Sequence, residues 1–337
     1  MDALQFSFIL PVFNRPDELK ELLQSFIAIE GDIDFEIVIV EDGSDIDCKS
    51  VVKGFEASLN ISYYSKPNSG PGASRNYGML KAKGNYFIIL DSDCLLPPQY
   101  LKVVTNELQK EFVDCYGGPD AADKSFTNLQ KAINFAMTSF ITTGGIRGSK
   151  SKNKKFQPRS FNMGISKAAF KASGGFGNIH PGEDPDLSIR LTKLGFKSKL
   201  LNDAFVYHKR RISWSKFYKQ VYKFGLVRPI LNLWHPTTNR QIYWLPTMFC
   251  IGFIIGIICA AFGNYFVLML YGLYIAFAFL LAIIQTKSLV IGVQAIFAIF
   301  VQFFGYGLGF IKSSFVIKVL RKNPETHYPK LFFKNVV

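Results

Sequence analysis

The stretch Tyr86-Phe87-Ile88-Ile89-Leu90-Asp91-Ser92-Asp93-Cys94 decides the fold of this chain. Its unbroken apolar run predicts a buried strand of a parallel sheet. The run ends on two carboxylates, Asp91 and Asp93, and a Pro97-Pro98 breaker follows. Ligands of open α/β sheets bind beyond the carboxyl ends of the strands. The two acids therefore lie where a binding site is expected.

Asp91 and Asp93 are also suited to a divalent ion. Mg²⁺ and Mn²⁺ prefer hard oxygen ligands, bind few protein carboxylates and complete their shell with substrate phosphates. The alternative is an Asp-rich turn that caps the next helix. The neighbouring sequence favours the metal site.

The residues before this stretch alternate between strand and helix patterns. Strands are expected at 6–12, 35–40 and 61–64, and helices at 16–29, near 48–59 and after the glycine-rich loop 68–78. Alternating strands and helices with right-handed crossovers predict a doubly wound, mostly parallel sheet of the α/β class. The glycine-rich loop lacks both the G-x-G-x-x-G spacing and the GK[ST] ending, so neither dinucleotide nor P-loop binding is indicated.

The charge of the chain is uneven. Its formal net charge is +14, and between Arg147 and Arg228 there are 19 Lys or Arg residues against four acids. Such a surplus favours polyanions, among them lipid headgroups and phosphorylated substrates. Part of it lies in the basic loop 144–157, which is either a solvated surface or a phosphate-binding segment. Five cysteines without a CxxC pair indicate a reduced, cytosolic catalytic part.

Acids gather again at Glu183, Asp184 and Asp186, where an amphipathic helix with Leu187 and Leu191 begins. Acids in a first helical turn favour the helix dipole, but three in four residues exceed what a cap needs. Other elements are expected as a helix at 133–141, a helix from 167 to about 172, and short strands at 196–200 and 204–207, which precede His208.

The C-terminal third is strongly apolar and predicts a membrane domain. Residues 209–228 mix aromatic and basic side chains, which favours an interfacial helix over one packed in the core. The stretches 243–262, 265–285 and 288–311 are long enough to span a bilayer. The resulting domains are 1–210, interfacial helices at 211–241, about three membrane segments at 242–312 and a basic tail at 313–337.

Orientation presents a conflict. Three crossings would place the basic tail opposite the cytosolic part, although positive residues favour the cytoplasmic side. The third segment is also interrupted by the glycines of Gly305-Tyr306-Gly307-Leu308-Gly309. We therefore expect it to bend back or to lie partly in the interface.

In this order, several motifs resemble those of the membrane-anchored family 2 glycosyltransferases, which have the GT-A fold. They are Pro11-Val12-Phe13-Asn14, Glu41-Asp42-Gly43-Ser44, Gly70 to Gly78, Asp91-Ser92-Asp93 and Gly182-Glu183-Asp184-Pro185-Asp186-Leu187. The resemblance covers about residues 5–210. It implies a GT-A type nucleotide-sugar-binding domain followed by interfacial helices and a C-terminal α-helical membrane domain.

The resemblance also implies roles for single residues. The nucleotide sugar would be bound by Pro11, Val12, Phe13, Arg15, Glu41, Asp42, Gly70, Arg75, Asp91 and Ser92. Asp93, Asp91 and His208 would hold Mg²⁺ or Mn²⁺, although a lone histidine is as often structural. Asp184 would be the general base and Glu183 its neighbour.

The function expected from these features is an inverting, metal-dependent transfer of one sugar from a nucleotide sugar, with UDP as the first candidate. The acceptor would be a lipid or lipid-linked molecule at the cytoplasmic face of the inner membrane, in which the chain is multi-pass. Processive synthases of the family carry Gln-x-x-Arg-Trp, whereas this chain has Gln220-Val221-Tyr222-Lys223-Phe224. A processive exopolysaccharide synthase and a non-catalytic membrane scaffold remain alternatives, and nucleic acid is not an expected partner.

Overall fold

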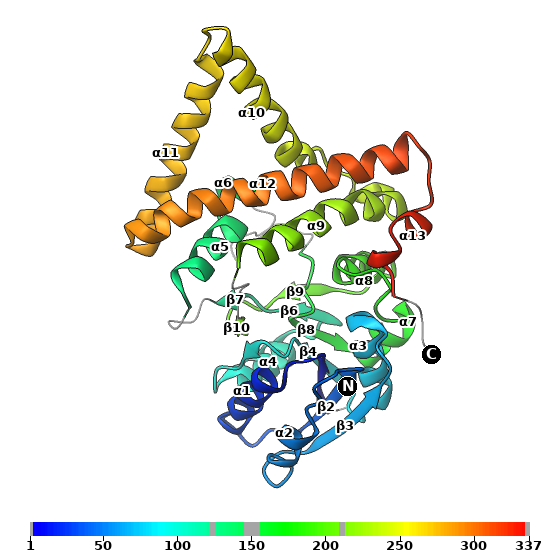
Figure 1. Cartoon of the computed structure of the whole chain (residues 1–337). Helices are drawn as coiled ribbons and strands as arrows, with labels where there is room; N and C mark the ends of the chain where they lie inside the picture. Colours follow the sequence, from blue (N-terminus) through cyan, green and yellow to red (C-terminus); the bar gives the residue numbers. More distant parts are fainter. Residues whose placement is uncertain (1–2, 122–125, 145–155, 209–212, 334–337) are drawn as a thin grey trace. The chain divides into compact units, whose positions relative to one another are not determined.

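The computed structural model describes residues 3–121, 126–144, 156–208 and 213–333 (Figure 1). Within these ranges the chain forms two compact units. The sheet unit contains residues 3–121, 156–208 and 330–333, and the helical unit contains residues 126–144 and 213–329. The C-terminal residues 330–333 thus belong to the sheet unit, although the helical unit precedes them in the chain.

The sheet unit is built on a seven-stranded sheet with the order β3-β2-β1-β4-β8-β6-β9. These strands are β1 (Phe6–Val12), β2 (Phe35–Asp42), β3 (Ile61–Lys66), β4 (Tyr86–Leu90), β6 (Cys115–Gly117), β8 (Asn162–Ser166) and β9 (Ser198–Leu200). Strands β3, β2, β1 and β4 are parallel, whereas β8 is antiparallel to both of its neighbours. The predicted α/β class with a mostly parallel sheet is confirmed.

A second, three-stranded sheet has the order β5-β10-β7. Its strands are β5 (Cys94–Leu95), β7 (Asp120–Ala121) and β10 (Val206–His208). Strand β5 begins directly after Asp93, and β10 pairs with it so that the backbone of His208 lies opposite Cys94. This small sheet therefore brings two predicted metal ligands, 115 residues apart by their numbers, to neighbouring backbone positions.

Helices cover both faces of the large sheet. Helices α1 (Pro16–Ile27), α2 (Lys49–Lys53) and α4 (Tyr100–Lys110) pack with Phe6, Phe8 and Leu10 of β1. Helices α3 (Gly70–Lys81), α7 (Lys167–Ser173) and α8 (Glu183–Lys193) pack on the opposite face, which Ile9 enters. Alternate residues of one strand enter different cores because side chains alternate across a sheet.

Two local predictions differ from the structure. The helix expected near 48–59 ends at Lys53, and residues 54–59 form turns. The glycine-rich stretch is mostly helical, because α3 begins at Gly70. Gly78 of this helix lies against the sheet, where a Cβ atom would be 2.6 Å from Cγ2 of Ile9. This glycine thus permits a close helix–sheet approach.

The helical unit contains α5, α6, α9 to α13 and two 3₁₀ turns. Their bounds are α5 (Asn128–Thr138), α6 (Phe140–Thr143), α9 (Trp214–Trp234), η1 (Pro236–Thr238), η2 (Gln241–Trp244), α10 (Leu245–Ala261), α11 (Phe266–Thr286), α12 (Leu289–Lys318) and α13 (Pro324–His327). A further turn, η3 (Pro329–Leu331), leads into the sheet unit. Three stretches, 241–261, 266–286 and 289–318, are long and apolar enough to cross a membrane.

Of the two alternatives for the third apolar segment, the bend is wrong, because α12 is one continuous helix through Gly305 and Gly309, and the interfacial position stays a prediction. These glycines serve its contact with α9. A Cβ at Gly309 would lie 2.4 Å from the carbonyl oxygen of Tyr222, and one at Gly305 would lie 2.6 Å from Cγ2 of Val221. Small residues let two helix backbones approach closely, so the glycines mark an interface between helices.

The core of the sheet unit yields a stability prediction. Phe8 is fully buried, and its ring lies 4.7 Å from that of Phe26 in an edge-to-face arrangement. Phe8→Ala should lower the local free energy of unfolding by about 3–5 kcal/mol, since it leaves a cavity. Hydrogen exchange of a peptide that covers β1 measures this loss. The exposed Leu80, changed to Ala, is the control and should stay within about 0.5 kcal/mol.

Candidate active site

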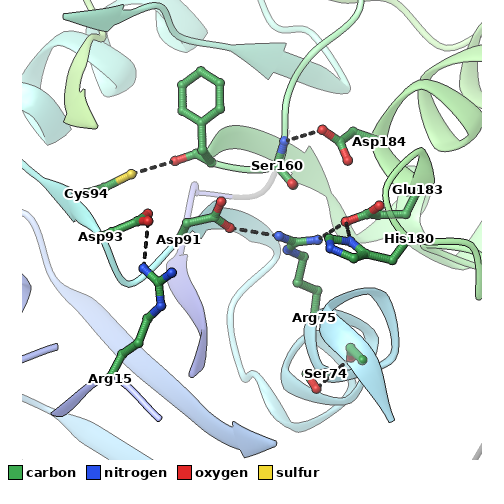
Figure 2. Close-up of polar contacts among 12 residues, drawn as sticks. Arg15, Ser74, Arg75, Asp91, Asp93, Cys94, Ser160, His180, Glu183 and Asp184 are labelled. Carbon is green, nitrogen blue, oxygen red and sulfur yellow. Dashed lines mark hydrogen bonds and ion pairs between the residues drawn. The ribbon is translucent and has the colours of Figure 1, made fainter. Parts of the chain in front are cut away.

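The centre of the candidate site is the buried guanidinium of Arg75, on α3. Its side chain is 4% exposed, and it donates hydrogen bonds to Asp91 (2.8 Å) and Glu183 (3.0 Å) (Figure 2). Its Cζ also lies 5.3 Å from the ring centroid of Phe176. Burial opposes the charge of Arg75, but the two carboxylates more than offset this and raise its pKa. One cation thus joins the end of β4 to the start of α8.

Asp91 and Asp93 follow β4 and engage different arginines. Asp93 accepts a hydrogen bond of 2.7 Å from Arg15, whereas Asp91 pairs with Arg75 (Figure 2). Burial opposes the charge of Arg15 as well, and Asp93 is the main group that raises its pKa. The Asp91 side chain remains 32% exposed and is open to a ligand.

Glu41 and Asp42, at the end of β2, are buried and already hydrogen-bonded within the protein. Asp42 accepts bonds of 2.9 Å from the backbone N–H groups of Ser69 and Gly70. Glu41 accepts one of 2.9 Å from the N–H of Cys48. The two acids therefore hold the start of α3 and the loop before α2. Their predicted contact with a nucleotide stays a prediction.

The first turn of α8 places two acids in different environments. Burial alone would raise the pKa of Glu183, but His180, whose Nδ1 is 3.0 Å from Oε1 of Glu183, and Arg75 outweigh it and lower that pKa to about 2. For Asp184, burial and then the negative charge of Glu183 raise the pKa. Two neighbouring carboxylates with divergent pKa values are typical of acid–base sites. Asp184, with the raised pKa, is the better proton acceptor.

Two buried polar atoms at this centre have no hydrogen-bond partner among the described residues. They are Oε2 of Glu183 and Nε of Arg75. Buried polar groups are nearly always satisfied by protein, water or ligand. An acceptor and a donor are therefore available to a bound molecule beside Asp184, whose Oδ2 lies 3.4 Å from the backbone N of Ser160.

The predicted metal ligands offer donor atoms of the kind that a divalent ion prefers. Asp91 and Asp93 supply hard oxygen atoms at a strand end, and the backbone of His208 pairs beside them. Among the side chains that the structure describes, no three His, Cys, Asp or Glu residues are placed so that together they could hold a metal ion. The side chain of His208 lies outside that set. The residues fit an ion that takes few protein ligands.

Of the other predicted residues, some lie in the loops that follow β1 and β4, and some fall outside the described residues. Phe13 is 47% exposed in the loop after β1, beside the buried Val12 and half-buried Pro11, and Ser92 is buried between the two aspartates. The basic loop expected at 144–157 falls mostly outside the described residues. The structure thus brings Asp91, Glu183 and Arg75 together.

One residue of this centre, His180, was not predicted to have a role. It precedes α8 and contacts Glu183 through its ring nitrogen. The sequence signal was its position three residues before Glu183, within His180-Pro181-Gly182-Glu183. A single histidine in a loop does not by itself indicate a function.

Residues 7–174, about half of the chain, match the family model described as "Glycosyl transferase family 2". This range contains β1, the Asp42 turn, Arg75 and the Asp91–Asp93 pair. The chain belongs to glycosyltransferase family 2. The sheet unit accordingly has the GT-A-like arrangement of this family, followed by helices of which three are long and apolar.

Relatives and solved structures agree with this family. An uncharacterized glycosyltransferase of Rickettsia conorii is 38% identical over 95 residues, which are 28% of this chain and 16% of that protein. A chondroitin synthase of Escherichia coli is 25% identical over 236 residues, 60% of this chain and 34% of that protein. The matches thus span 16% and 34% of these two relatives, so the activity of the whole chain is a matter for proposal.

The solved structure of a mannosyltransferase from Pyrobaculum calidifontis, in complex with GDP-Man and Mn²⁺, is similar over most of its length. Its TM-score is 0.59, with 16% sequence identity, and the match covers 90% of this chain and 87% of that one. At this identity the likeness shows the shared fold.

The opposite pKa shifts of Glu183 and Asp184 lead to a prediction about how turnover depends on pH. The resemblance implies that Asp184 is the general base, and a base must be deprotonated to act; in that role, turnover of this chain should fall as the pH drops through the raised pKa of Asp184. Glu183→Gln removes one charge that raises this pKa, so the acidic limb of the kcat profile should move to lower pH. Glu56→Gln, at an exposed position, should leave the limb in place. An unmoved limb in Glu183→Gln would contradict the electrostatic assignment.

Proposed function

We propose that this chain is a metal-dependent, inverting glycosyltransferase that moves one sugar from a nucleotide sugar to a lipid or lipid-linked acceptor at the cytoplasmic membrane face. The observation that carries the proposal is the contact of Arg75 with both Asp91 and Glu183. This contact joins the strand end where a donor diphosphate would bind to the turn that carries Asp184.

The proposed reaction is a single displacement. The acceptor hydroxyl oxygen forms a bond to the anomeric carbon, while the bond between that carbon and the diphosphate oxygen breaks. Asp184 takes the hydroxyl proton, and the nucleoside diphosphate leaves with the bonding electron pair. Attack from the face opposite the leaving group inverts the anomeric centre. The raised pKa of Asp184 supports its role as base, because proton transfer is most efficient when the pKa lies nearer the working pH.

Donor binding is assigned to the loops beyond β1, β2 and β4. Phe13 is an exposed aromatic side chain at the end of β1 that could stack on the base, and Arg75 would orient the donor through Asp91. UDP is the first candidate nucleotide. The GDP-Man complex of the Pyrobaculum calidifontis mannosyltransferase makes GDP the second nucleotide to be tested.

Asp91, Asp93 and His208 would hold Mg²⁺ or Mn²⁺. The ion, when bound, would neutralise charge that develops on the leaving diphosphate. Arg15 already offsets the charge of Asp93, so the aspartate pair is held in place before any ion binds.

The acceptor is assigned to the membrane because of the helical unit. Helices α10 and α11 have no charged residue, and Figure 1 shows them joined at a tip formed by residues 262–265. At 1.5 Å per residue they are about 25 Å and about 31 Å long. A hairpin of this length supports insertion into a bilayer.

Helix α12 is assigned to the membrane surface. It lies along α9, whose Lys216, Lys219 and Lys223 are exposed. Charged side chains at the centre of a bilayer are costly, whereas a basic, aromatic helix is stable in the interface. The contacts of residues 330–333 within the sheet unit support the same conclusion, because residues that follow α12 would then lie on the same side of the bilayer as the sheet unit.

A processive polysaccharide synthase is the second candidate function. It is favoured by the similarity to a chondroitin synthase over 60% of this chain. Transfer of a single sugar is preferred because the membrane part is small and Gln-x-x-Arg-Trp is absent. Product length on a gel separates the two. A non-catalytic scaffold is disfavoured, since Asp91, Asp93, Glu183 and Asp184 are all present.

The proposed activity is tested with the purified full chain, Mn²⁺ and a panel of UDP- and GDP-sugars, with release of nucleoside diphosphate as readout. Asp184→Asn should lower transfer at least about 100-fold, as expected for loss of a general base. Nucleotide binding, measured by calorimetry, should change little. Asp203→Asn, at an exposed position, is the matched control. Comparable turnover in Asp184→Asn would refute its assignment as base.

The membrane arrangement is tested by single cysteines in a cysteine-free background. Cysteines at Lys20 on α1 and at Lys330 should react with a membrane-impermeant maleimide from the same side of the membrane. A cysteine at Asn264, in the hairpin tip, should react from the other side. Labelling of Lys330 and Lys20 from opposite sides would mean three crossings and would overturn the surface assignment of α12.

A further inference from the structure

The last described residues of the chain form a short return segment, Lys330–Phe333, that packs on the sheet unit. Phe332 forms an antiparallel bridge with Ile179. The N–H of His180 donates to the carbonyl of Leu331 (2.8 Å), and the N–H of Phe333 donates to the carbonyl of Asn178 (2.9 Å). The return segment thus holds the backbone of the loop that leads into α8.

Two side chains fix the return segment in place. Leu331 is 4% exposed. The ring of Phe333 lies against Gly70, so closely that a Cβ at Gly70 would be 2.3 Å from a ring atom. The same ring is 6.2 Å from that of His180, centroid to centroid. Phe333 therefore fills the space between the start of α3 and the loop before α8.

The first half of that loop is held by other groups. The side-chain amide of Asn76 exchanges two hydrogen bonds of 2.8 Å with the backbone of Phe176. Arg190 donates to the carbonyl of Gly175 (2.6 Å). Residues 178–180 follow this anchored part, and their backbone bonds go to the return segment. His180 then contacts Glu183, the partner of Arg75.

We propose that the return segment is a positioning element of the active site. By fixing the loop at 178–180, it sets His180 and the first turn of α8, and hence Asp184, relative to Arg75. The segment is assigned to act through this loop, without a direct part in the chemical step. This inference rests on the proposed function for its kinetic consequence, but the contact itself can be tested without turnover.

A positioning role fits the segment better than a general contribution to stability. The two hydrophobic cores of the sheet unit are formed by residues of the sheet and of the helices on its faces, and residues 331–333 belong to neither. Loss of the segment should therefore leave the sheet folded. It should release only the loop and the start of α8.

The experiment compares the full chain with Phe333→Ala, Phe333→Leu and a deletion of residues 330–337. Lys330→Ala is the matched control, because this side chain is exposed in the same segment. Hydrogen exchange is measured in peptides covering 178–186 and β4. UDP and GDP binding is measured by calorimetry, and kcat and KM are measured with UDP-GlcNAc and GDP-mannose.

Phe333→Ala and the deletion should speed exchange at 178–186 and leave β4 unchanged. Turnover should fall about 10- to 100-fold, the range expected when a catalytic group is misplaced, with nucleotide affinity within about twofold. Phe333→Leu should recover part of the loss, and Lys330→Ala should match the unaltered chain.

Two results would overturn the inference. One is unchanged exchange at 178–186 after the deletion. The other is a parallel loss of β4 protection, nucleotide affinity and kcat, which would mean general unfolding. If the unaltered chain turned over no donor while the deletion still released 178–186, the proposed function would fail and the positioning contact would stand.

Discussion

The candidate site depends on one buried cation that two elements must share. The Arg75 guanidinium is almost inaccessible to water, and its charge is offset by Asp91, directly after β4, and by Glu183 of α8. Removing one partner of a buried ion pair leaves an uncompensated charge and is costly. The end of the strand and the start of the helix are therefore tied to each other through α3. The position of Asp184 follows, because it is the residue after Glu183.

The place of Arg75 depends in turn on how α3 lies on the sheet. Asp42 binds the first N–H groups of the helix, where a negative charge is favoured by the helix dipole. Gly78 has no Cβ atom, and this lets the helix pack closely against Ile9 of β1. Asp42, which the sequence predicted as a nucleotide-binding residue, thus also stabilises the start of α3. In this chain, a substitution of Asp42 would therefore also disturb the start of α3.

Segments that are far apart in the chain together form the sheet unit. The sheet unit is interrupted by the helical unit and is completed by residues 330–333. In the loop before α8, the backbone N–H of His180 and the carbonyl of Asn178 form hydrogen bonds with these last described residues. This loop therefore depends on residues that follow α12 in the chain.

The sequence by itself determined the elements with strong local signals. Strands β1, β2 and β4 are buried on both faces, so each contains a continuous apolar run in the sequence. Helices α1 and α8 are buried on one face, so their apolar residues recur at helical spacing. The three apolar helices follow from length and composition alone. The acids at strand ends were also visible, because a parallel sheet gathers such ends at one edge.

Only the tertiary structure decided which of these groups meet. The pairing of Arg75 with Glu183 joins residues 108 positions apart, and no local pattern encodes such a contact. The same holds for His180, for the glycines of α12 that contact α9 instead of bending the helix, and for the return of residues 330–333. Each is fixed by packing between elements that are distant in the chain. Local sequence specifies which residues are buried or charged, whereas their partners depend on how the whole chain folds.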